Sequence, residues 1–124
     1  MAIVADYKHL SDKSIDLKVA SSEIAGNMRH TFEFNLTETP VTGEGALIAW
    51  NMRREYNYPV SYKVEVNGAY AARYTANETD WHAVHENIPS NSIHAGENTV
   101  TFEVTSGAGI VSIGDVTLWY RKNI

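Results

Sequence analysis

Apolar and polar residues alternate along much of this chain, and alternation with a period of two is the signature of β-strands that bury one face. The alternating runs lie at residues 15–19, 32–36, 62–66, 100–104 and 116–120, and residues 46–52 form a mostly apolar run suited to burial on both faces. No stretch of ten or more residues shows the period of an amphipathic helix. The pattern therefore predicts an all-β protein.

Turn residues separate these runs. Asn67-Gly68 stands between the run at 62–66 and the next at 69–74, and this dipeptide favours a tight β-hairpin. Gly114-Asp115 interrupts the last apolar stretch, which predicts a β-bulge or bend that shifts the side-chain parity. About eight strands joined in this way predict a two-sheet antiparallel β-sandwich, most simply a jelly roll, as a single domain over residues 1–124.

Composition agrees with a packed core and excludes several classes of protein. Of the 124 residues, 44% are hydrophobic and 20% charged, as in globular proteins. The absence of cysteine excludes disulfides, thiolate zinc sites, iron–sulfur clusters and cysteine nucleophiles. A net charge of −5 argues against a nucleic-acid partner, which would be bound through its phosphates.

The sequence shows no signal for membrane insertion or secretion. The apolar stretch at the chain start ends at Asp6, well short of the roughly 7–15 apolar residues of a secretory signal. No run approaches the roughly 20 apolar residues of a membrane span. We therefore expect no membrane partner, and the localisation stays open between the cytoplasm and export by another route.

Two C-terminal segments carry the most specific pattern. Residues 93–102 read IHAGENTVTF and residues 113–120 read IGDVTLWY. Together with VEVNG at residues 64–68, they resemble strands of the galactose-binding-domain-like jelly roll, which is found in many carbohydrate-binding modules and lectins. In this pattern Gly96 suits a turn with positive φ, and Asn98 can bond the neighbouring backbone. The resemblance covers about half of the chain and implies a fold, without a family-specific binding motif.

Metal binding has little support in the sequence. Many modules of the fold that this chain resembles carry a structural calcium near the chain start, but Asp6, Asp12 and Asp16 have no recognisable loop spacing. The HxxHE segment at residues 82–86 does not match a zinc motif, because strand positions three apart point to opposite faces. The sequence thus indicates no cofactor and leaves a structural calcium open.

A sugar site needs an aromatic ring for the apolar face of the sugar and planar polar groups for its hydroxyls. Residues 50–58 offer both in what we interpret as the loop after a strand. The candidate ligand-binding residues there are Trp50, Asn51, Arg53, Arg54, Tyr56 and Tyr58. The alternative is that Trp50 lies in the core and the remainder is an ordinary solvated connection.

A second candidate patch lies at residues 77–87. Trp81, flanked by Asp80 and His82, supplies an aromatic platform with hydrogen-bonding neighbours. The alternative is that Trp81 packs beneath the loop, because tryptophan is usually highly buried.

The leading hypothesis is a non-catalytic, lectin-like module that binds carbohydrate by stacking sugar rings on loop aromatics. No nucleophile elbow, phosphate loop or marked carboxylate pair supports an enzyme. The main alternative is a structural or assembly protein without a small-molecule ligand, in which Tyr56, Tyr58, Trp119 and Tyr120 would lie in subunit contacts. A small enzyme on the same scaffold is a third hypothesis, and the sequence leaves open whether the chain forms a homo-oligomer.

Overall fold

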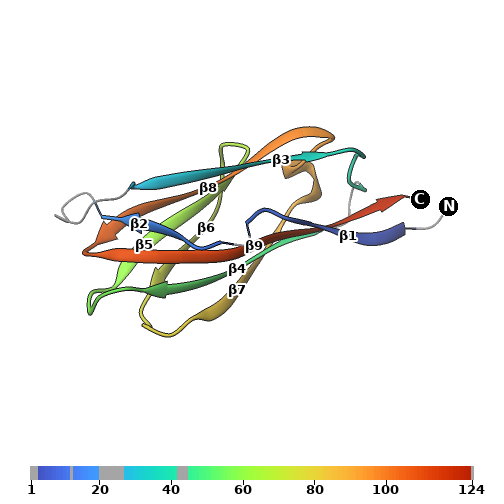
Figure 1. Ribbon diagram of the computed structural model, residues 1–124. Helices are drawn as coiled ribbons and strands as arrows, with labels where there is room; N and C mark the ends of the chain where they lie inside the picture. The colour runs from blue at the N-terminus through green and yellow to red at the C-terminus, as the bar shows by residue number, and fades with distance from the viewer. Residues whose placement is uncertain (1–2, 12, 20–26, 42–44, 124) are drawn as a thin grey trace.

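The computed structural model describes residues 3–11, 13–19, 27–41 and 45–123 (Figure 1). These residues form nine strands and one short 3-10 helix. The strands are β1 (Ile3–His9), β2 (Ile15–Lys18), β3 (Arg29–Leu36), β4 (Ala46–Arg54), β5 (Val60–Val66), β6 (Ala69–Ala76), β7 (His82–Ile88), β8 (Gly96–Gly107) and β9 (Ile110–Asn123), and the helix is η1 (Ser90–Ser92). None of the described residues forms a helix with the length and hydropathy that a membrane span requires.

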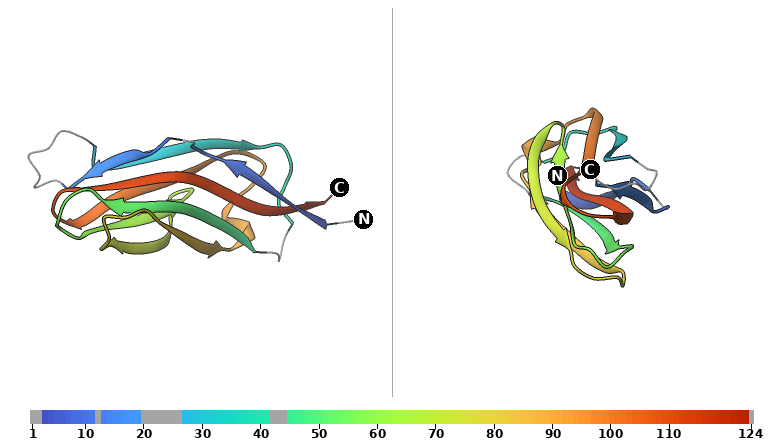
Figure 2. Two further views of the ribbon diagram at one scale, coloured as in Figure 1. Left: turned by 60° about the horizontal axis from the view of Figure 1, so that its bottom comes forward. Right: turned by 90° about the vertical axis from the view of Figure 1, so that its left-hand side faces the viewer.

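The strands form two antiparallel sheets that pack face to face (Figure 2). One sheet has the order β1-β9-β4-β7, with β2 also paired to β9, and the other has the order β3-β8-β5-β6. The predicted two-sheet sandwich and jelly roll are confirmed, with nine strands instead of about eight. Two strands were not among the predicted runs, Ile3–His9 and His82–Ile88. They end the β1-β9-β4-β7 path of one sheet, and β1 buries no side chain fully while β7 buries only Ile88.

The core lies between the sheets and is built from the alternating residues. Strand β3 buries Phe32, Phe34 and Leu36 on one face and exposes the residues between them. Strand β8 buries Val100, Phe102 and Val104 in the core, and because it lies inside its sheet, Thr101 between them is buried as well. The described core residues from both sheets form one contiguous cluster, so each sheet shields the apolar face of the other from water.

Two local features of the backbone were predicted and are confirmed. Asn67 and Gly68 have φ of 50° and 81° and join β5 to β6, with Val66 opposite Ala69. Positive φ at both central residues is the geometry of a type I′ turn. On β9, Asp115 has φ of 51° and forms a bulge, because the pairing with β4 shifts by one residue between Thr117 and Gly114.

A buried asparagine holds the chain where it leaves η1 and enters β8. Asn98, 1% exposed, accepts hydrogen bonds from His94 N (3.0 Å) and Asn67 Nδ2 (2.9 Å). Its own Nδ2 donates to the carbonyl oxygens of His94 (2.8 Å) and Gly96 (3.1 Å). One amide therefore ties the β5–β6 hairpin to the turn before β8.

We expect Asn98→Ala to lower the free energy of unfolding by about 2–3 kcal/mol, because it leaves buried donors and acceptors without partners. Urea denaturation of the variant beside Asn35→Ala, an exposed asparagine on β3, measures the difference. Equal midpoints for the two variants would contradict the structural role of this amide.

The two sheets are also linked at the β6–β7 edge. The hydroxyl of Tyr74 on β6 donates a hydrogen bond to Glu86 Oε2 on β7. Burial, reinforced by this bond, raises the pKa of Tyr74 to about 12. Burial likewise raises the pKa of Tyr62 and of Tyr120 above the ordinary tyrosine value.

These tyrosines predict a loss of stability at alkaline pH. Because the folded state raises their pKa, their contribution is complete below the unfolded value of 10.0 and is lost as the pH rises towards about 12. Melting curves recorded between pH 10 and about 12 should show a Tm that falls as the pH rises. The Tm of Tyr74→Phe should fall less steeply with pH than that of the wild type. An identical slope for the two proteins would rule out Tyr74 as a contributor.

Candidate functional site

The outer face of the five-stranded sheet carries the candidate site. Asn51 and Arg53 on β4 point away from the core, because Trp50 and Met52 between them are buried. The β4–β9 pairing places Gly114 opposite Asn51 and Ser112 opposite Arg53. Thus side chains from neighbouring strands meet at this end of the sheet.

A hollow of about 310 Å³ opens on this face. It is lined by Ser14, Asn51, Trp81, Gly114 and Asp115. Asn51 Nδ2 donates a hydrogen bond to Asp115 Oδ2 (3.0 Å), so the amide and the carboxylate hold each other in place. The hollow therefore combines one aromatic side chain with a hydroxyl, an amide and a carboxylate.

Trp81 forms the aromatic side of the hollow and is 43% exposed. It lies just before β7, and the edge of its ring packs over Gly114, where a Cβ would be in ordinary van der Waals contact with ring atoms at 3.6 Å. The guanidinium carbon of Arg53 lies 4.8 Å from the ring centroid, which is a cation–π contact. The glycine and the arginine thus fix the orientation of a half-exposed ring.

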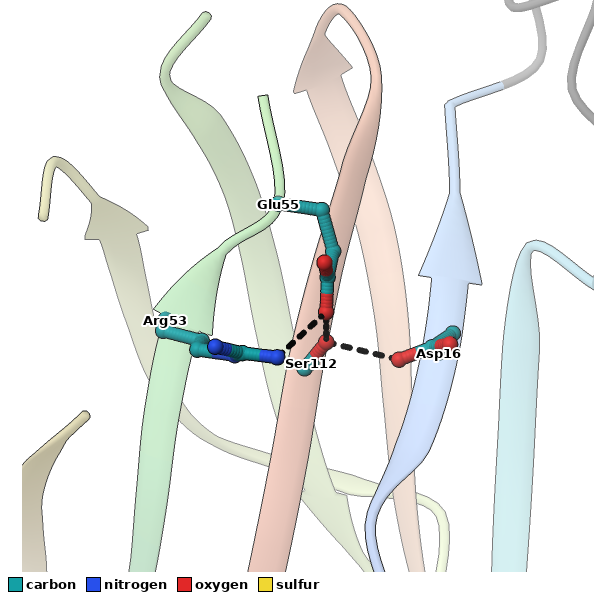
Figure 3. Close-up of polar contacts among 4 residues, drawn as sticks. All are labelled: Asp16, Arg53, Glu55 and Ser112. Atoms are coloured by element: carbon teal, nitrogen blue, oxygen red, sulfur yellow. Dashed lines mark hydrogen bonds and ion pairs between the residues drawn. The ribbon is translucent and has the colours of Figure 1, made fainter. Parts of the chain in front are cut away.

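A polar network joins three strands beside this ring (Figure 3). Arg53 Nη2 pairs with Glu55 Oε1 at 3.1 Å. The hydroxyl of Ser112, a residue only 1% exposed, lies 2.6 Å from Glu55 Oε1 and 2.6 Å from Asp16 Oδ1. The serine has one proton, so it donates to one carboxylate at a time. The network links β2, β9 and the end of β4 and holds Arg53 against Trp81.

The structure brings together three of the predicted residues, Asn51, Arg53 and Trp81, from two separate sequence patches. It places Trp50 elsewhere: this residue is 2% exposed, and its Nε1 donates to the hydroxyl of Tyr62 (2.8 Å) inside the core. Trp50 was predicted to stack on a ligand, and that prediction is wrong because no face of its ring reaches solvent. The alternative interpretation as a core residue is correct.

The other predicted residues lie around the hollow and not in it. Arg54 faces the opposite side of β4 from Arg53, because it pairs with Val111. His82 pairs with Met52 and so shares that inner side, where it is half-buried. Asp80 is exposed next to Trp81, without contributing to the lining of the hollow.

Tyr56 and Tyr58 are 46% and 60% exposed and follow the end of β4. The predicted loop is shorter than expected, since β4 runs on to Arg54. The ring of Tyr56 lies against Gly109 in the β8–β9 turn, where a Cβ would meet it at 3.5 Å. These two tyrosines therefore belong to the end of the sandwich and not to the hollow.

Sequence reasoning missed Ser14, Asp115 and the network residues Asp16, Glu55 and Ser112. Their convergence depends on the pairing of β2 with β9, which no local pattern reveals. The one available signal was the interruption at Gly114-Asp115, which predicted the bulge but not its place in a site.

Metal binding finds no support among the described side chains. They include no group of three or more His, Asp or Glu residues placed to hold a metal ion. Asp6 pairs with Lys122 Nζ (2.9 Å), and Asp16 is engaged by Ser112; Asp12 lies outside the described residues. Of these three acidic residues, the two that the structure describes are thus each engaged by a neighbouring side chain.

Comparison with protein-family models and with curated protein sequences gives no match. Solved structures do match. A family 35 carbohydrate-binding module from an environmental isolate has a TM-score of 0.58 at 12% identity, with 94% of this chain and 90% of that chain covered. A CBM36 module in complex with calcium and xylotriose has a TM-score of 0.51 at 10% identity, covering 98% of this chain and 100% of that one.

A similar fold also occurs as a small part of a much longer protein. Dimeric latent PorU from Porphyromonas gingivalis matches with a TM-score of 0.59 at 9% identity, over 98% of this chain but only 13% of that chain. The chain thus has the jelly-roll fold of carbohydrate-binding modules. At these identities the likeness establishes the fold alone, and the function depends on the site.

Proposed function

We propose that this chain is a non-catalytic carbohydrate-binding module whose ligand occupies the hollow beside Trp81. The observation that carries the proposal is the half-exposed Trp81 ring, held in a fixed orientation over a hollow that Asn51, Asp115 and Ser14 line with polar groups. The apolar face of a sugar packs on the aromatic ring, and the amide, carboxylate and hydroxyl bond the sugar hydroxyls. The carbohydrate-binding modules among the structural neighbours support the same class of ligand.

The charges around the hollow favour an uncharged sugar over an anionic one. Arg53 is already paired with Glu55 and stacked on Trp81. Arg54 faces the other side of the sheet. The carboxylate of Asp115 accepts one hydrogen bond from Asn51 through Oδ2, and a carboxylate has further acceptor sites for hydroxyls and repels anions.

The arrangement also favours binding over hydrolysis. Glycoside hydrolysis uses two carboxylates that flank the scissile bond. Beside the hollow, Asp16 and Glu55 both converge on the buried hydroxyl of Ser112, which occupies the position between the two carboxylates.

The proposal is tested by screening the labelled protein on an array of mono-, oligo- and polysaccharides, with calcium and with a chelator. We expect a coherent set of hits that share one sugar and persist without calcium. Circular dichroism and light scattering on the same sample establish that it is folded and give its size. A blank array from a folded sample would overturn the proposal.

A further inference from the structure

A second exposed aromatic cluster lies on the same outer face, towards the opposite end of the sheet. Tyr7 on β1 and Trp119 on β9 are 57% and 43% exposed, and their ring centroids lie 5.0 Å apart. The two residues are direct partners across the β1–β9 pairing. Adjacent large aromatics left in solvent typically mark an interaction surface.

A hollow of about 360 Å³ adjoins this pair. Its lining includes Trp119, Leu47 and Asn87, which stand in one row across β9, β4 and β7. Asn87 is exposed and lies two strands from Trp119, with Leu47 of β4 between them. The lining of this hollow thus includes an indole and an asparagine, the two residue types that Trp81 and Asn51 supply in the first hollow.

Small side chains lie on the outer face of the sheet between the two hollows. In the row after Trp119, the outer face carries Thr117 on β9 and Ala49 on β4. The row after that carries Gly114 beside Asn51, and Ala83 on β7. From Leu47 to Asn51 the distance is four residues, or roughly 13 Å along the strand. One sugar ring does not span that distance, but a chain of several rings does.

We propose that the two hollows are subsites of one trough, which binds an internal stretch of a linear polysaccharide lying along the strands. This proposal rests on the proposed function and extends it from the sugar class to the form of the ligand. A trough with aromatic ends and a floor of small residues fits a narrow chain. The central row also has exposed His9 and His85 at its margins, and their ring nitrogens are suited to hydrogen bonds with sugar hydroxyls.

The test measures binding to linear polysaccharides (xylan, mixed-linkage β-glucan, mannan and dextran) and to the oligosaccharide series of the polysaccharide bound. We expect affinity to rise with oligosaccharide length. Trp119→Ala and Tyr7→Ala should each weaken binding of the longest fragments, about tenfold for Trp119→Ala, and leave the shortest fragments unaffected. The matched control is Tyr70→Ala, which removes a 68% exposed aromatic from the other sheet and should change nothing.

Three results would overturn the trough. Binding that is independent of oligosaccharide length and of Trp119 would leave the proposed function intact but confine the ligand to the Trp81 hollow. No binding to any saccharide by the folded wild type would overturn both proposals. A dimer that Trp119→Ala dissociates without changing polysaccharide binding would assign this face to self-association.

Discussion

Trp81→Ala is expected to abolish detectable carbohydrate binding while leaving the fold intact. The substitution removes the only aromatic side chain among the described residues that line the hollow and takes the cation–π partner from Arg53. Stacking of a sugar on the ring contributes of the order of 1 kcal/mol, in addition to the free energy gained by burying the apolar surface of the ring. Losing the stacking and the buried area together should weaken binding at least tenfold. Titration calorimetry with a saccharide identified on the array measures the loss.

Trp81→Phe is the informative companion variant, because it keeps a smaller aromatic face at the same position. It should retain part of the affinity, and both variants should melt close to the wild type since the side chain is half-exposed. Full binding by Trp81→Ala would place the ligand elsewhere. A large fall in Tm would instead mean that the residue serves the fold.

In contrast to Trp81→Ala, Trp50→Ala is expected to cause a large loss of stability. Trp50 is 2% exposed and packs edge-to-face on Tyr74 and Phe102, with its N–H bonded to Tyr62. Removing such a side chain costs about 3–5 kcal/mol, which for a chain of this length corresponds to a fall in Tm of roughly 10–20 °C. Thermal and urea denaturation monitored by circular dichroism check the value.

Tyr62→Phe separates the packing of this cluster from its hydrogen bonding. The Tyr62 hydroxyl accepts from Trp50 and donates to Met52 Sδ (2.6 Å), so its removal leaves the indole N–H buried without a partner. We expect the free energy of unfolding to fall by about 1–3 kcal/mol, less than for Trp50→Ala.

If Trp50→Ala lost saccharide affinity and kept its melting temperature, the assignment of Trp50 to the core would be wrong.

The fold was predictable because its determinants are local. Alternation in a strand such as β3 fixes which side chains face the core, and Asn67-Gly68 fixes a hairpin through its own φ preferences. Strands β1 and β7 were missed because an edge strand pairs along one side only and buries few side chains, which leaves little trace in the sequence.

The candidate site was predictable only in its parts. Trp81 and Asn51 each stood out as residues suited to sugars, but their meeting depends on β4 lying between β7 and β9. Residue type alone also does not tell which tryptophan is exposed. Trp50 and Trp81 have the same chemistry, and only the sheet pairing puts Trp50 in the core and Trp81 in solvent. The carboxylates around Ser112 come from distant segments and carried no local signal.

The bulge at Asp115 has a consequence for tracing relatives of this chain by alignment. The extra residue sets the orientation of everything before it on β9, so that Ser112 and Gly114 face outward and Ile113 inward. A homologue lacking one residue between Ile113 and Val116 would carry the same letters with inverted orientation. Its isoleucine would face the side of the sheet that carries the Trp81 hollow, and its serine would face the interior. The presence or absence of a residue at this position therefore indicates whether a homologue keeps the lining of this hollow, which overall percentage identity does not.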